Sequence, residues 1–117
     1  GGRAMNIQSF GTNMSFDTKK AQRWFKERGI RFQMIDMKEK GMSRGEFDNV
    51  YRAVGGWAKL VDENAKDKDT LALLKWLDAS PQADTLFANQ QLFSQPIVRN
   101  GRQATEGYCP EVWEKWE

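Results

Sequence analysis

The residue best placed for chemistry in this sequence is Ser15, which lies in a loop between an apolar segment and an amphipathic one, within residues 10–21. A side chain at such a junction meets the N-terminus of a helix, where the helix dipole and free N–H groups stabilise negative charge. A cysteine in this place gains a pKa well below about 8.5 and becomes a reactive thiolate. A serine hydroxyl stays protonated there. Ser15 therefore has a position suited to a nucleophile without being one.

The sequence holds no histidine and a single cysteine, Cys109. Without imidazole, no Ser-His-Asp triad, no Cys-His pair and no histidine metal ligand can be assembled, and we predict no metal site. One cysteine excludes an intrachain disulfide, a Cys-X-X-Cys pair and a thiolate zinc cluster. Cys109 precedes Pro110 far from Ser15 in the sequence, and we interpret it as incidental. Any redox cycle would need an external thiol.

Length and composition indicate one soluble globular domain. The chain has 117 residues, of which 39% are hydrophobic and 29% charged, as is ordinary for such proteins. No run approaches the roughly 18 apolar residues that span a membrane. The net charge of +2 is too small to indicate nucleic-acid binding by itself. Residues 1–4 are typical of an expression-tag remnant, with no signal pattern after them. We therefore expect a cytoplasmic domain over residues 5–117.

The first part of this domain is predicted to be a strand, a helix and a second strand. Residues 7–10 are short, apolar and followed by glycine, which favours a strand. The helix that follows has Asp17 or Thr18 as its expected N-cap and Gly29 as its stop. Residues 30–36 alternate and predict a second strand parallel to the first. The expected buried face of the helix consists of Ala21, Trp24 and Phe25.

Residues 43–90 are predicted to form a helical insertion. Ser43 and Glu46 have the spacing of a capping box and start the clearest helix in the chain. Ser80, followed by a proline, is the expected cap of a later helix. Between these two helices, helical spacing resumes at Leu73, Leu74 and Leu77.

The end of the chain predicts a hairpin and a final helix. Residues 97–99 and 103–105 flank an Asn-Gly-Arg segment at 100–102, and Asn-Gly between such runs is a strong hairpin signal. Pro110 then opens a helix. The side chains expected to pack this helix against the sheet are Val112, Trp113 and Trp116.

Some charged and aromatic side chains fit either of two interpretations. The basic residues at the start of the first helix, Lys19 among them, either attract a bound anion or form a solvated basic face. The acidic residues between 62 and 69 suit a hard cation, but we interpret them as an exposed linker. Trp57 and Trp76 lie in the insertion and are candidates for a partner surface.

The loop and the order of the elements resemble the arsenate reductase (ArsC) and Spx family. The loop of that family reads aromatic-Gly or aromatic-Thr, a few residues, Cys, three residues, a basic pair and Ala. Residues 10–21 match this pattern, with Ser15 in place of the cysteine. The resemblance covers residues 6–117, and its further marks are Gly29-Ile30, Asp36, Gln95-Pro96-Ile97-Val98 and Gly107-Tyr108.

This resemblance implies an α/β fold of the thioredoxin-like (glutaredoxin-like) type, in which a mixed four-stranded sheet is flanked by helices and carries the insertion. It implies that Pro96 is cis and faces the loop. It places Ser15 at the catalytic position, needs no bound cofactor, and makes glutathione or thioredoxin the external reductant. The positions that it implies for substrate or anion binding are Thr12, Asn13, Lys19, Lys20, Gln95 and Pro96.

Two further departures from the family weigh against arsenate reduction. Family reductases have arginine directly before the proline, where its planar fork holds an oxyanion, and this chain has Gln95. A second family arginine lies in the region that here covers residues 61–66, which has no arginine and two acids. Both departures weaken the expected binding of arsenate.

Two functions of different classes follow. The first is a thiol-linked oxidoreductase scaffold, dependent on glutathione or thioredoxin, whose catalysis is lost or altered because Ser15 replaces the nucleophile. The second is a non-enzymatic regulator of the Spx type, which binds RNA polymerase or another protein. The partners expected are accordingly a small thiol or oxyanion in the first case and a protein in the second.

Overall fold

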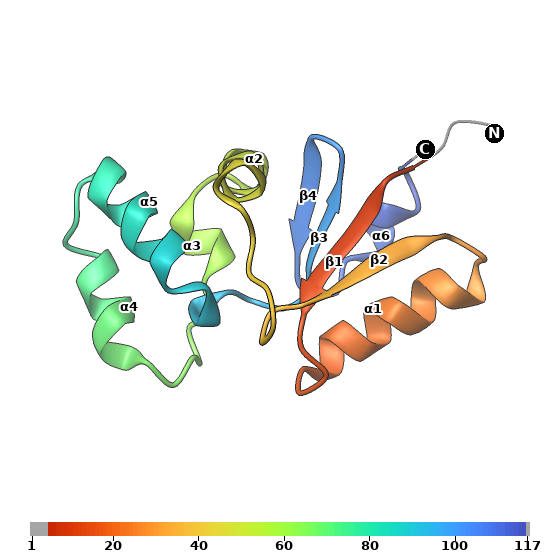
Figure 1. Ribbon diagram of the computed structural model, residues 1–117, viewed down its shortest axis with the longest axis horizontal. Helices are drawn as coiled ribbons and strands as arrows, with labels where there is room; N and C mark the ends of the chain where they lie inside the picture. The colour runs from red at the N-terminus through yellow and green to blue at the C-terminus, as the bar shows by residue number, and fades with distance from the viewer. Residues whose placement is uncertain (1–4, 117) are drawn as a thin grey trace.

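A four-stranded mixed sheet with strand order β2-β1-β3-β4 forms one half of the molecule (Figure 1). β1 is parallel to β2 and antiparallel to β3, and β3 is antiparallel to β4. This computed structural model describes residues 5–116, so the predicted tag at residues 1–4 lies outside the described part. The mixed sheet and the parallel first pair of strands are confirmed. The strands are β1 (Ile7–Gly11), β2 (Phe32–Asp36), β3 (Ile97–Asn100) and β4 (Gln103–Glu106).

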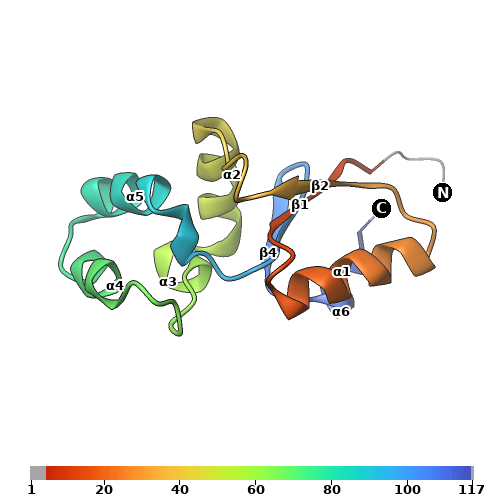
Figure 2. The same cartoon turned by 60° about the horizontal axis from the view of Figure 1, so that its bottom comes forward.

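The helices divide into two groups. In Figure 2, α1 and α6 lie together below the sheet, and α2 to α5 form a separate group to the left of the sheet. The second group lies within the predicted insertion, whose last turn is a short 3-10 segment, η1. Among residues 5–116, no helix is both long enough and apolar enough to cross a bilayer. The bounds are α1 (Phe16–Glu27), α2 (Arg44–Val54), α3 (Trp57–Leu60), α4 (Lys68–Leu74), α5 (Ala79–Ala88), η1 (Gln90–Leu92) and α6 (Pro110–Trp113).

Two hydrophobic clusters hold these layers together. Ile7 of β1 packs with α1 and α6, whereas Phe10 of the same strand packs with the insertion, as the alternation of strand side chains requires. The α1–α6 cluster buries Trp24, Trp113 and Trp116, which confirms the predicted core role of these tryptophans. The insertion cluster is centred on Phe47, which contacts Tyr51, Phe87 and Phe93.

Ser15 is the N-cap of α1, and the prediction of Asp17 or Thr18 as the cap was wrong. The Ser15 backbone is extended, and its Oγ accepts a hydrogen bond from the Thr18 amide at 3.2 Å. Thr18 is not available as a cap because its side chain is fully buried beneath the loop. The helix therefore begins two or three residues earlier than the sequence pattern indicated.

Three other predictions within the elements need correction. The hairpin turn consists of Gly101 and Arg102, because Asn100 still pairs with Gln103; Gly101 has φ +59°, which glycine tolerates. Helix α5 begins at Ala79 rather than after Ser80. In α4 it is Leu71 and Leu74 that are buried, and Leu73 is exposed because it falls on the opposite face of the helix.

The tryptophans of the insertion have different environments. Trp57 is half-buried and packs against the insertion cluster, so only part of it faces outwards. Trp76 is 86% exposed. Of the two predicted candidates for a partner surface, Trp76 alone is fully presented to solvent.

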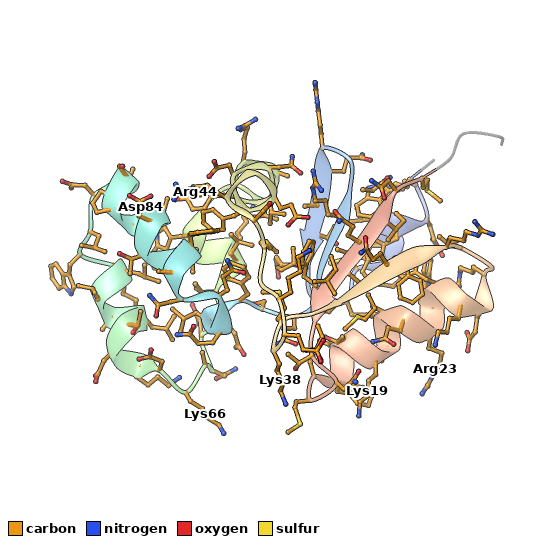
Figure 3. All side chains as sticks on the ribbon, in the orientation of Figure 1. Lys19, Arg23, Lys38, Arg44, Lys66 and Asp84 are labelled. Carbon is orange, nitrogen blue, oxygen red and sulfur yellow. The ribbon has the colours of Figure 1, made fainter. Side chains whose placement is uncertain are left out.

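The predicted capping box of α2 is confirmed. The Ser43 hydroxyl accepts a hydrogen bond from the Glu46 amide, and the Glu46 carboxylate accepts one from the Ser43 amide. Arg44, in the first turn, bridges Asp48 of its own helix and Asp84 of α5. Arg44 and Asp84 point toward each other in Figure 3, and the pair ties the first and last long helices of the insertion together.

Candidate functional site

The candidate site lies where the loop between β1 and α1 meets the start of β3. Thr12 and Ser15 close the loop through a backbone hydrogen bond from the Ser15 amide to the Thr12 carbonyl at 3.1 Å. The Gln95–Pro96 peptide bond opposite is cis, as the resemblance implied. Ser15 is half-buried at the helix N-terminus, with its Oγ on the Thr18 amide.

Gln95 fills the centre of the loop. Its Oε1 accepts hydrogen bonds from the Thr12 amide at 2.7 Å, the Thr12 hydroxyl at 3.2 Å and the Thr18 hydroxyl at 3.4 Å. These donors are of the kind that would hold an oxygen of an external anion. Because Gln95 supplies that oxygen from within the chain, these donors of Thr12 and Thr18 are already satisfied without a ligand.

Gly11 allows this approach of the loop to Gln95 and Thr18. A Cβ at position 11 would lie 2.5 Å from Thr18 Oγ1 and 3.3 Å from Gln95 Oε1. The first distance is far inside van der Waals contact, so a side chain would push the loop away from α1. The glycine before the loop is therefore required by packing.

A cleft of about 760 Å³ opens beside Ser15 and Gln95. We call it the Ser15 cleft. It is lined by the start of α1, the segment between α3 and α4, the segment from η1 to β3, and the end of β4. Its charged lining residues are Asp17, Asp62, Lys66, Asp67 and Glu106. Four carboxylates and one ammonium group give this cleft an acidic character, which opposes the binding of an anion such as arsenate.

Two of these carboxyl groups have shifted proton affinities. Burial raises the pKa of the Glu106 carboxyl, and the Lys59 ammonium offsets part of that rise. Hydrogen bonds from the hydroxyl and the backbone amide of Thr70 lower the pKa of Asp67. Asp67 therefore stays ionised at the N-terminus of α4, where it is also the N-cap.

The sequence-predicted site residues fall into two sets. Thr12, Ser15, Gln95 and Pro96 come together around the loop. Asn13 is exposed beside it, and Lys19 and Lys20 do not line the Ser15 cleft. Figure 3 shows Lys19 and Arg23 on the side of α1 that faces away from the sheet. Lys20 lies with its Nζ 4.2 Å from the centre of the Tyr108 ring, a cation–π geometry.

The acidic lining is the part of the site that sequence reasoning missed. The sequence around Asp62 predicts an exposed linker, yet Asp62 and Asp67 line the cleft. No sequence signal marks Glu106, which lies 91 residues beyond Ser15 in the sequence. The only sequence signal was the pair of acids in the region where the family has arginine.

Cys109 lies outside the lining of the cleft but close to α1. Its Sγ donates to the Glu106 carbonyl at 3.2 Å. Burial first, and then the charges of Glu111, Glu106 and Asp17, raise the pKa of this thiol. Among residues 5–116, no three His, Cys, Asp or Glu side chains lie together so as to hold a metal ion.

Gln95→Ala is expected to lower the free energy of unfolding by about 1–3 kcal/mol, since the donors of Thr12 and Thr18 would lose their acceptor. Urea unfolding gives this value, and hydrogen exchange of the Thr12 amide should become faster. Gln103→Ala, an exposed change on β4, is the matched control and should leave both unchanged. Equal stability and equal exchange in Gln95→Ala would show that water replaces the amide oxygen without cost.

The parallel β1–α1–β2 unit, the antiparallel β3–β4 hairpin and the cis proline that faces the β1–α1 loop define a thioredoxin-like fold. The insertion between β2 and β3 distinguishes this chain within that class. No family model and no curated protein matches the sequence.

Solved structures of ArsC-family proteins share this fold over nearly the whole chain. An ArsC family related protein from Bacteroides fragilis superposes with a TM-score of 0.82 at 22% sequence identity, covering 97% of this chain and 98% of its own. An arsenate reductase from Vibrio cholerae gives 0.78 at 20% identity, with 94% and 96% covered. An arsenate reductase related protein from Brucella melitensis gives 0.69 at 20% identity, with 99% and 98% covered. The fold with its helical insertion is thus the fold of these proteins.

Proposed function

We propose that this chain is a member of the arsenate reductase and Spx family that keeps the scaffold of a thiol-linked oxidoreductase and lacks its nucleophile. The observation that carries the proposal is the position of Ser15. Its Oγ is the N-cap of α1 and accepts the Thr18 amide, in a loop that faces the cis Gln95–Pro96 bond. A thiolate in this place would receive the same hydrogen bond and the same dipole.

The rest of the site supports a change in substrate as well as in the nucleophile. Gln95 occupies the loop donors with its own oxygen, and four carboxylates line the cleft. Both features disfavour arsenate. With a cysteine at position 15, the scaffold would reduce a disulfide with glutathione or thioredoxin as the external reductant. We propose a cytoplasmic location, because such a cycle needs a reducing thiol pool.

The test is thiol-dependent turnover of arsenate and of a model disulfide by the chain as it stands and by Ser15→Cys, both also in a Cys109→Ser background. We expect no turnover by the chain itself and disulfide reduction by Ser15→Cys, with little arsenate reduction. Adding Gln95→Arg to Ser15→Cys should raise arsenate turnover at least tenfold, because an arginine fork binds the oxyanion. Absence of turnover in every variant would contradict the proposal of an oxidoreductase scaffold.

A regulator of the Spx type, which works by binding RNA polymerase or another protein, is the second candidate. One observation favours it. Met14 and Phe16, on either side of Ser15, are 79% and 74% exposed, and large apolar side chains in solvent are typical of contact surfaces. Binding to purified RNA polymerase that is lost in the double variant Met14→Ser, Phe16→Ser, with Ser15 unchanged, would support this function over the first.

A further inference from the structure

A second hollow, distant from the Ser15 cleft, lies between α2 and the β3–β4 hairpin. It measures about 770 Å³ and shares no lining residue with the Ser15 cleft. β3 starts next to the cis proline and ends at this hairpin, so the two hollows belong to opposite ends of one strand. We call it the arginine pocket, because its lining is Arg52, Arg99 and Arg102 with Asn49, Ala53 and Gly101.

Arg99 is held in a fixed orientation at this pocket. Its Nε donates to Asn49 Oδ1 at 2.5 Å and its Nη1 donates to Gln8 Oε1 at 2.6 Å. The register of β1 and β3 places Gln8 directly opposite Arg99, so the sheet itself sets the second of these contacts. A guanidinium group bound at two points loses little further freedom when it binds a ligand.

The acceptors that hold Arg99 are neutral amides, so its charge is not neutralised at contact distance. In the described part of the chain the ion pairs within 4.0 Å all involve Arg44, with Asp48 and Asp84. Arg99 is half-buried. Its counter-charge is the Glu46 carboxylate, which accepts a hydrogen bond from Gln8 Nε2 at 3.4 Å. Burial acts against the shift, but hydrogen bonds from Ser43 and Gln8 and the charge of Arg99 together lower the pKa of Glu46. Glu46 therefore offsets the charge of Arg99 through Gln8 and not by a direct ion pair.

The neighbours of Arg99 increase this positive charge. Arg52 and Arg102 are exposed at the same hollow, and no carboxylate is among its lining residues. Three guanidinium groups around one hollow repel each other, and an anion between them would reduce that repulsion. The Ser15 cleft has four acidic lining residues, so an anionic ligand would favour the arginine pocket over that cleft.

We propose that the arginine pocket binds a phosphate group, either free or as the monoester of a small molecule, with Arg99 as the fixed donor and Arg52 and Arg102 as its exposed neighbours. Phosphate suits this pocket because planar guanidinium groups donate two parallel hydrogen bonds to its oxygens. This site is independent of the oxidoreductase scaffold proposed above, since it uses none of the same residues.

The test of this proposal is an NMR titration of the whole chain with inorganic phosphate at low ionic strength. It follows the signals of the backbone amides and of the arginine Nε–H groups. We expect saturable shifts at Asn49, Gly101 and Arg102. The dissociation constant should rise at least tenfold in Arg99→Gln. A smaller rise is expected in the double variant Arg52→Gln, Arg102→Gln, whose two exposed positions leave the fold intact. Arg23→Gln, which removes an exposed arginine of α1, is the matched control and should bind as the unchanged chain does.

A parallel titration with adenosine monophosphate distinguishes the sources of the phosphate group. Tighter binding of the monoester would support a small phosphorylated metabolite as the ligand, and equal binding would support free phosphate. Shifts that do not saturate, that centre on the Ser15 loop, or that weaken equally in Arg23→Gln would overturn the proposal.

Discussion

In a Ser15→Cys variant the new thiol is expected to titrate below about 7.5, whereas Cys109 titrates above the usual range for a thiol. At position 15 the thiolate would accept the amide hydrogen bond that Ser15 now accepts from Thr18 and would meet the positive end of α1. Both lower its pKa, and we expect them to outweigh the opposing carboxylates that line the cleft. At Cys109 burial and the surrounding carboxylates act in the opposite direction and raise the pKa. At neutral pH a much larger fraction of the first thiol than of the second is therefore ionised.

The measurement is the pH dependence of alkylation by iodoacetamide, since only the thiolate reacts. Two chains with one cysteine each separate the contributions: Ser15→Cys with Cys109→Ser, and the unchanged chain, which has Cys109 alone. We expect the first to react at least tenfold faster at pH 7, and its rate to fall only as the pH drops through its lowered pKa. Equal rates would mean that the loop does not stabilise a thiolate and would remove the physical basis of the proposed scaffold.

Trp113→Ala is expected to lower the free energy of unfolding by about 3–5 kcal/mol, as for other large aromatic side chains removed from a core. Trp113 is 2% exposed and contacts Trp24, Phe25 and Tyr108, with ring centres 4.9–5.5 Å apart. Its indole N–H also donates to the Thr105 hydroxyl at 2.8 Å. The variant loses this packing and leaves the buried hydroxyl without a donor.

Urea unfolding with an unchanged m-value would measure this loss as a change in stability alone. Trp76→Ala is the matched control, because it removes the same side chain from a position that is 86% exposed, and it should change stability by less than about 0.5 kcal/mol. Trp113→Phe should fall between the two, since it keeps most of the ring contacts and loses the hydrogen bond. A Trp113→Ala chain as stable as the control would show that α6 contributes little to the fold.

Much of the fold was predictable because its signals are local. The capping box of α2 acts over three residues, and the buried face of α1 consists of side chains three and four positions apart. The order of strands and helices followed from such signals, and the resemblance to a known family added the cis proline at Pro96. The error at the start of α1 came from a contact that is not local. Thr18 is not the cap of this helix because its hydroxyl donates to Gln95, 77 residues away.

The sequence alone determined that this chain has no histidine and no cysteine in its loop, which already removes most nucleophilic and metal-assisted mechanisms. It also determined the elements, since periodicity and capping depend on neighbours along the chain. Only the tertiary structure decided the character of the two hollows. Three separate segments bring carboxylates to the cleft beside Ser15, and strand register sets Gln8 opposite Arg99. Such contacts depend on how distant segments pack, and no pattern within one segment specifies them.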